Sequence, residues 1–320
     1  MNAPILKGAL GLATGLALAG GAALAQDDYP ERTIEVVHQY GPGGGTDRFV
    51  RAVAEPFAEI AGEQMVPVSV QGGGGIPAVT NFLQRPADGH SLMAISPAQV
   101  IAHVQGRIDM ADFMPLARVQ FDQALIWVPA DSPYETIQEF IAAAEADPGA
   151  VSVAISGAAG FDEVTVGLFG LETDTTLTTV PFSSSEMVSN TVGGQVDAMF
   201  EEFGPARGLW ESGDLRPLVV FSEERLPVLP DVPTATELGY DVTLGRWRAF
   251  AMQAEDEMEH AQTLYDMIGQ AVETESYKEF EAQSALQYRS ELIGLDEFSA
   301  FIDGEIETYT AVLRELGYIE

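Results

Sequence analysis

The sequence predicts an α/β protein with two lobes and a ligand cleft between them. Apparent strands, glycine- or serine-rich loops and apparent helices alternate along the chain, an order typical of parallel sheets flanked by helices. Two apolar segments, residues 121–128 and 219–226, are placed so that they can cross between two such sheets. Because ligands of these folds bind at the carboxyl ends of the strands, the loops that follow the strands are the candidate binding elements.

The first of these loops, residues 40–47, is a glycine-rich turn between a strand-like segment and a helical pattern. A helix that begins at such a turn exposes its first N–H groups and the positive end of its dipole, and glycine lets a ligand approach the backbone. The turn therefore favours an anion seat, although a tight structural connection explains it equally well. The spacing of its glycines and the lack of a following Gly-Lys-Ser/Thr argue against a nucleotide phosphate.

Other loops repeat the arrangement of strand, small residues and helix. Residues 71–77 contain four consecutive glycines, and residues 156–162 form a loop of small residues that leads into a helix. Ser183 and Glu186 have the spacing of a capping box, which starts a helix, and so do Thr136 and Glu139.

Two local features carry sharper expectations. Pro56 lies within the first helical pattern, so we expect a kink or an early end there. Residues 116–129 are apolar over most of their length and predict one long strand.

The charge of the chain excludes some classes of partner. With 49 acidic and 15 basic residues, the formal net charge is -34. Nucleic acid and anionic lipid are poor partners for such a protein, and the acidic residues indicate a heavily solvated surface. An anionic ligand would also be repelled, so local donors must overcome this field, which added salt would screen.

Motifs for catalysis are missing from the sequence. It contains no Cys, hence no disulfide and no thiol nucleophile, and it has no Gly-x-Ser-x-Gly elbow and no metal-ligand spacing among its four His. His38 is the one histidine placed near the predicted cleft, where a core histidine is the preferred interpretation. We expect no enzyme activity, no cofactor and no metal, with a periplasmic hydrolase as the less favoured alternative.

The first 25 residues have the pattern of a secretory signal. They are short and apolar, with Lys7 as their only charge, and Ala23-Leu24-Ala25 fits a cleavage site. A permanent N-terminal anchor is the alternative. No later stretch is long and apolar enough to span a bilayer, so we expect residues 26–320 to form a protein of the periplasm.

Short motifs follow one another in a characteristic order along residues 26–320. They are Tyr29-Pro30, Gly41-Pro42-Gly43, residues 71–75, Asp88-Gly89-His90, Gly193-Gly194-Gln195-Val196-Asp197, Gly213-Asp214-Leu215-Arg216-Pro217 and Leu229-Pro230-Asp231-Val232-Pro233-Thr234. With this ordered set, the chain resembles the periplasmic solute receptors of tripartite tricarboxylate transporters.

The resemblance implies a type II periplasmic-binding-protein fold that closes on a small organic carboxylate and passes it to membrane permease subunits. The implied boundaries are residues 26–125 with 223–320 for lobe 1, and residues 126–222 for lobe 2. We expect a monomer. A receptor that reports its ligand to a signalling partner is an alternative that the sequence does not separate from transport.

The expected ligand contacts combine positions carried over from the family with residue types suited to carboxylates. They are Gly43, Gly44, Gly45, Thr46, Asp47, Gly73, Gly74, Gly75, Ser156, Gly157, Ala158, Asp162, Ser183, Ser184, Trp247 and Arg248. Backbone N–H groups and the hydroxyls among them would form charge-assisted bonds to carboxylate oxygens.

Several of these positions have two interpretations. Asp47 either caps the helix or contacts the ligand, and Trp247 belongs either to the core or to the ligand wall. We expect only one of Arg246 and Arg248 to face the cleft, and favour Arg248. Glu201 and Glu202 would disfavour a trianion if they face the cleft. Tricarboxylates, dicarboxylates, aromatic carboxylates and acidic amino acids all remain compatible with a seat built from main chain.

Overall fold

The computed structural model describes Met1 and residues 29–156, 158 and 160–320. The predicted signal segment lies outside the described residues apart from Met1, and so does Gly157. No helix in the described residues combines the length and apolar character needed to cross a membrane.

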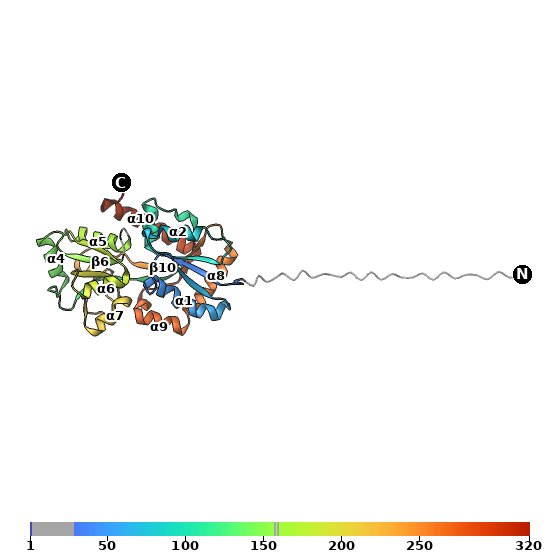
Figure 1. Ribbon diagram of the computed structural model, residues 1–320, viewed down its shortest axis with the longest axis horizontal. Helices are drawn as coiled ribbons and strands as arrows, with labels where there is room; N and C mark the ends of the chain where they lie inside the picture. Colours follow the sequence, from blue (N-terminus) through green and yellow to red (C-terminus); the bar gives the residue numbers. More distant parts are fainter. Residues whose placement is uncertain (2–28, 157, 159) are drawn as a thin grey trace.

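Two mixed sheets form the centres of two lobes (Figure 1). The first sheet has the order β11 (Ile293–Gly294), β4 (Phe113–Asp122), β10 (Arg246–Gln253), β3 (Ser91–Ile95), β1 (Ile34–His38) and β2 (Met65–Ser69). The second has the order β7 (Thr178–Phe182), β6 (Ser152–Ser156), β8 (Ala198–Glu202), β5 (Ala124–Pro129) and β9 (Leu215–Val220). Strands β1, β2 and β3 are parallel, as are β6, β7 and β8, whereas β4, β5, β9, β10 and β11 pair antiparallel.

Helices cover the faces of both sheets. Lobe 1 carries α1 (Gly45–Ala61), α2 (Ile76–Leu83), α3 (Pro97–Val104) and α8 (Met258–Val272), and lobe 2 carries α4 (Ile137–Ala146), α5 (Phe161–Glu172), α6 (Ser184–Val192) and α7 (Phe203–Ser212). Short 3-10 turns are η1 (Gly73–Gly75), η2 (Met110–Asp112), η3 (Thr236–Leu238) and η4 (Leu286–Tyr288).

The last two helices contact both lobes. α9 (Glu275–Ser284) packs against α1 of lobe 1 and α7 of lobe 2, and α10 (Leu295–Glu315) packs against α3 and α5. Buried residues of α10, including Ile302 and Tyr309, share one apolar cluster with strands of both sheets. The two lobes are therefore joined by a common core as well as by the chain crossings between β4 and β5 and between β9 and β10.

Two local expectations are confirmed and two need correction. Both capping boxes form, with Thr136 and Ser183 as the N-caps of α4 and α6. Of the kink or early end expected at Pro56, the early end is wrong, since helix α1 continues to Ala61. The single strand expected over residues 116–129 is wrong: the chain leaves the first sheet after Asp122 and enters the second at Ala124. The crossing lies within residues 121–128, as expected, but an apolar run does not show where one buried strand ends and the next begins.

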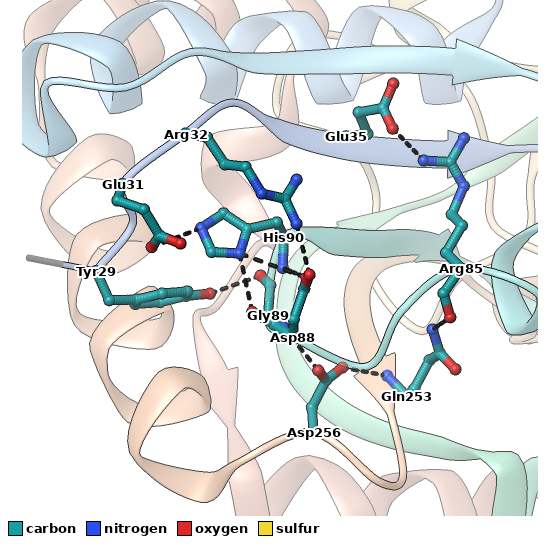
Figure 2. Close-up of polar contacts among 10 residues, drawn as sticks. All are labelled: Tyr29, Glu31, Arg32, Glu35, Arg85, Asp88, Gly89, His90, Gln253 and Asp256. Atoms are coloured by element: carbon teal, nitrogen blue, oxygen red, sulfur yellow. Dashed lines mark hydrogen bonds and ion pairs between the residues drawn. The ribbon is translucent and has the colours of Figure 1, made fainter. Parts of the chain in front are cut away.

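The Asp88-Gly89-His90 motif lies at the amino ends of β1 and β3, where it contacts the first described residues (Figure 2). We call Tyr29, Asp88, Gly89, His90 and Asp256 the Tyr29–Asp256 network. Tyr29 Oη donates to the Gly89 carbonyl at 2.6 Å, and Asp256 accepts the Gly89 N–H at 2.7 Å. The Tyr29 ring also stacks on His260 with centroids 3.9 Å apart.

Burial is pronounced within this network. It raises the pKa of the Tyr29 hydroxyl well above its usual range, with the Asp256 charge adding to the effect. It also raises the pKa of Asp256, although the Gly89 and Gln253 N–H groups oppose the shift. The network thus fastens the start of the described chain to β3 and to the turn before α8, on the side of the sheet opposite the glycine loops.

Candidate functional site

A cleft of about 900 Å³ lies at the carboxyl ends of the parallel strands of both sheets. Its lining comes from the two lobes together. The lining residues are Gln39, Tyr40, Gly41, Pro42, Gly43, Gly44, Gly45, Gln71, Gly72, Gly74, Gly75, Ala98, Arg107, Ser156, Ala158, Gly160, Phe161, Asp162, Phe182, Ser183, Val188, Glu201, Pro205 and Arg246.

Six helices begin beside this cleft. The lining includes residues in or just before the first turns of α1, α2 and α3 from lobe 1 and of α5, α6 and α7 from lobe 2. Each start brings N–H groups without intrahelical acceptors and the positive end of a helix dipole. The cleft therefore has donors for an anion even though the chain as a whole is strongly acidic.

The second glycine loop needs glycine for steric reasons. Gly75 has a φ of +89°, and a Cβ added there would collide with the side-chain amide of Gln39. Gly74 has a φ of +61°, and its Cβ would lie 2.5 Å from Arg107 Nη2. Residues with side chains rarely adopt these φ values, so the loop can pass this close to its neighbours only as glycine.

Acidic side chains already occupy some of the loop amides. Asp47 accepts the Gly43 N–H at 2.9 Å, Asp162 accepts the Ser156 N–H at 2.7 Å, and Glu186 accepts the Ser183 N–H at 3.2 Å. In each loop the acceptor lies in the first turn of the following helix. These bonds hold the loops in shape and leave other amides of the helix starts for a ligand.

Asp47 is bound on several sides within the protein. Besides Gly43, it accepts from Arg51 Nε at 2.8 Å, and His38 Nε2 lies 3.6 Å away. Its pKa is lowered: burial opposes the shift, and the bonds from Arg51 and Gly43 outweigh burial. Asp47 is buried and does not line the cleft, so its contacts are those of a loop-fixing carboxylate.

A buried charge cluster lies where the two lobes meet at the cleft. Its members are Asp122, Asp162, Glu201, Glu202, Arg246 and Arg248. The Arg246 guanidinium contacts both Asp162 and Glu202, and Arg248 Nη2 lies 3.1 Å from Glu202 Oε2. Because the arginines come from β10 and Glu202 from β8, these ion pairs connect the lobes.

Protons help to balance the charge of this cluster. Burial and the Glu202 charge raise the pKa of Asp122 to about 8, and burial and Glu202 also raise the pKa of Glu201 well above its usual range. Burial lowers the pKa of Arg246 to about 10, which still leaves it charged at neutral pH. Asp162 and Glu202 are the acids that contact Arg246, and Glu202 also contacts Arg248.

The sequence identifies the kind of protein that carries this cleft. Residues 49–317 match the tripartite tricarboxylate transporter family receptors. The chain belongs to this family. Its members are solute-binding receptors and not enzymes. The two-lobed fold and the cleft agree with this assignment.

Relatives of this receptor resemble it along nearly their whole length. Protein BugT of Bordetella pertussis is 27% identical over 313 residues, which cover 94% of this chain and 95% of BugT. MatC from Rhodopseudomonas palustris with bound malate has a TM-score of 0.79 at 24% identity, covering 89% of this chain and 100% of MatC. An R. palustris protein with adipate has a TM-score of 0.81 at 22% identity, covering 91% and 99%.

The receptor brings about half of the expected contact residues to the cleft. Gly43, Gly44, Gly45, Gly74, Gly75, Ser156, Ala158, Asp162 and Ser183 line it. Thr46, Asp47, Gly73, Trp247 and Arg248 are not among the lining residues. Ser184 begins α6, but its side chain lies outside the described part of the receptor.

The expectation for the two arginines needs correction. Only one of the two arginines lines the cleft, as expected, but the preference for Arg248 is wrong. Side chains two apart on a strand point to the same face, so Arg246 and Arg248 both reach Glu202. Arg246 lines the cleft, whereas Arg248 lies deeper, between Glu202 and Asp122. Trp247 points to the other face, where it is fully buried against Phe298 and Phe301.

Sequence reasoning did not single out several lining residues of the receptor. Gln39 directly precedes the first glycine loop, so its place at a strand end was an available signal. Tyr40 and Gln71 are the first residues of the two loops but were not expected as ligand contacts. Arg107 lies in the turn after α3, where no motif marks it. Glu201, weighed as an obstacle to a trianion, does line the cleft.

His38 has no partner arrangement suited to hydrolysis. It is fully buried at the end of β1, and burial lowers its pKa despite the nearby Asp47 charge. Among the described residues, no group of three or more His, Asp or Glu is placed to hold a metal ion.

Proposed function

We propose that the protein captures a small organic carboxylate in the interlobe cleft and delivers it to a tripartite tricarboxylate-type membrane permease. The observation that carries the proposal is that helix starts from both lobes meet at one cleft. A carboxylate placed there can accept charge-assisted bonds from both lobes at once. A ligand that bridges the lobes favours the closed form over the open one.

The proposed seat uses main chain more than side chains. On lobe 1 it comprises the amides around Gly44, Gly45 and Gly74, and on lobe 2 it comprises Ala158 and Ser183. The volume of about 900 Å³ fits a small-molecule site. Support for the ligand class comes from the malate and adipate found in two structural relatives, since both molecules are carboxylates.

The receptor works in the periplasm in this proposal. Residues 1–25 are removed on export, residues 26–125 and 223–320 form lobe 1, and residues 126–222 form lobe 2. The protein acts as a monomer, and closure creates the surface that the permease recognises.

A thermal-shift screen tests this proposal directly. Residues 26–320 are denatured and refolded to remove any carried-over ligand, then heated with a panel of mono-, di- and tricarboxylates, amino acids and the matching amides. Binding to the native state alone stabilises it by roughly 2.7 kcal/mol at a hundredfold excess over the dissociation constant. A shift with one carboxylate and none with its amide supports the proposal, and no shift with any acid contradicts it.

A further inference from the structure

Four charged side chains line the cleft: Arg107, Asp162, Glu201 and Arg246. Two are acids and two are arginines, so the arginines are the side chains that could pair with a ligand carboxylate. Their surroundings differ greatly, and that difference decides which of them is available.

Arg246 already forms ion pairs within the protein. Its guanidinium contacts the carboxylates of Asp162 and Glu202, and its side chain is only 10% exposed. Moving Arg246 toward a ligand would leave the buried Asp162 carboxylate without its cationic partner and would leave Glu202 with Arg248 alone, which is destabilising. Arg246 therefore fixes the floor of the cleft and is not a free ligand contact.

Arg107 has a different set of contacts. Its Nη2 donates to the Gly73 carbonyl at 3.1 Å, and its Nη1 lies 3.5 Å from Gln105 Oε1. Both acceptors are neutral, and no carboxylate of the described residues lies within ion-pair distance of this exposed guanidinium. In a chain with 49 acidic residues, a cleft arginine that faces only neutral acceptors keeps its charge available.

The position of Arg107 is also suited to an anion seat. The bond to Gly73 holds the guanidinium against the second glycine loop, and Gly74 leaves the space that a side chain would take from it. A guanidinium offers five N–H donors in a fixed plane, so two bonds to loop and glutamine oxygens leave others for a carboxylate.

We propose that Arg107 is a specificity-determining residue that pairs with a ligand carboxylate held at the Gly73–Gly75 loop. This inference rests on the proposed function, because it names the cationic partner within the same cleft. The ion pair offsets the repulsion that the net charge of the chain exerts on an anion. It also makes the receptor prefer a carboxylate over a neutral isostere such as the amide.

Affinity measurements on two variants test the role of Arg107. With a carboxylate that binds the wild-type receptor, Arg107→Gln is expected to weaken binding roughly 10- to 100-fold, the range for losing a hydrogen bond to a charged group. Arg107→Lys keeps the charge and is expected to lose less. The gap between wild type and Arg107→Gln should narrow as salt is added, because salt screens the pair.

Arg216→Gln is the matched control. Arg216 also donates to neutral carbonyls, those of Ala130 and Tyr134, but it does not line the cleft. Its loss should leave affinity unchanged. The discrimination between carboxylate and amide adds a readout that loop distortion alone would not produce, since Arg107→Gln should reduce it.

The outcomes separate this inference from the function on which it depends. If wild type binds a carboxylate and Arg107→Gln binds it equally well, the role of Arg107 is refuted while the proposed function stands. Equal losses with carboxylate and amide would likewise refute an ion pair. If wild type binds no carboxylate, the proposed function fails and the inference fails with it.

Discussion

The main-chain groups of glycine are bonded differently at the two ends of the lobe 1 sheet. At the amino ends of the strands, both main-chain groups of Gly89 are bound inside the protein, the carbonyl by Tyr29 and the N–H by Asp256. At the carboxyl ends, Gly45 begins α1, so its N–H has no intrahelical acceptor, and it lines the cleft.

This difference indicates that motifs behind the family resemblance can serve the fold and not the cleft. The Tyr29–Asp256 network and the glycine loops both contributed to the resemblance, yet only the loops reach the cleft. Changes in the network should therefore alter stability and leave affinity intact, and changes in the loops should do the reverse. The predictions below test this separation.

The largest expected effect is on affinity. Gly44 is the N-cap of α1 with a φ of -68°, a conformation that a β-branched residue can adopt. Gly44→Val should therefore fold, but its side chain would block the seat and weaken binding by more than about 1,000-fold, or about 4.1 kcal/mol. Calorimetric titration measures the affinity, and circular dichroism shows whether the variant folds. Retained affinity in a folded variant would refute a ligand seat built from main chain.

The next effect is on stability. Asp256→Ala removes the acceptor of the Gly89 and Gln253 N–H groups, both buried. Each unsatisfied donor costs about 1–3 kcal/mol, so the free energy of unfolding should fall by about 3 kcal/mol in a denaturant titration. Asp256→Asn keeps one acceptor and should lose less. The ligand dissociation constant should stay the same. A tenfold change in it would show that the Tyr29–Asp256 network affects ligand binding as well as stability.

A third effect belongs to the charge cluster at the cleft. The folded-state pKa of Asp122, about 8, exceeds the ordinary value near 4. The native state therefore holds a proton that the unfolded chain releases between these values, and stability should fall as pH rises through this window. One proton changes the free energy by up to about 1.4 kcal/mol per pH unit.

Asp122→Asn tests the origin of this slope. Glu201, Glu202, Arg246 and Arg248 face the same cluster and stay in place, so only part of the slope should disappear. Unfolding curves between about pH 5 and pH 9 measure it in both proteins. An unchanged slope in the variant would place the titrating group elsewhere.

The smallest expected effect is the change in the free energy of unfolding on removing an exposed ion pair beside the Tyr29–Asp256 network. Arg32 and Asp88 form a 2.6 Å ion pair, but their side chains are 51% and 42% exposed. Exposed pairs contribute about 0–1 kcal/mol, so Arg32→Ala should change the free energy of unfolding by less than about 1 kcal/mol. A loss as large as that of Asp256→Ala would show that exposure is a poor guide to this region.

Patterns in the sequence predicted the elements better than the contacts between them. The capping boxes at Thr136 and Ser183 act within four residues, so local spacing was enough to place the starts of α4 and α6. The crossing between the sheets was expected within residues 121–128 and occurs near Gln123. The end of one strand and the start of the next were missed, because both strands are buried and the run is apolar throughout.

The site was predictable where it depends on backbone and less so where it depends on side-chain pairing. Glycine runs marked both loops of lobe 1. Arg246 pairs with Asp162 and Glu202, which are distant from it in sequence and contact it only in the folded protein. Arg107 stands out for the reverse reason, since no carboxylate of the described residues pairs with it, which no sequence pattern reports.

A crystal structure of residues 26–320 with a carboxylate selected by the thermal-shift screen tests the proposed site. We expect carboxylate oxygens of the ligand within hydrogen-bonding distance of the amides at the start of α1 and of Arg107 at the Gly73–Gly75 loop, with the lobes closed around the ligand. A second cavity, of about 380 Å³, lies beside Trp210 and Leu229 on lobe 2. A ligand bound there, with the interlobe cleft open and empty, would contradict the proposal that the interlobe cleft is the carboxylate site.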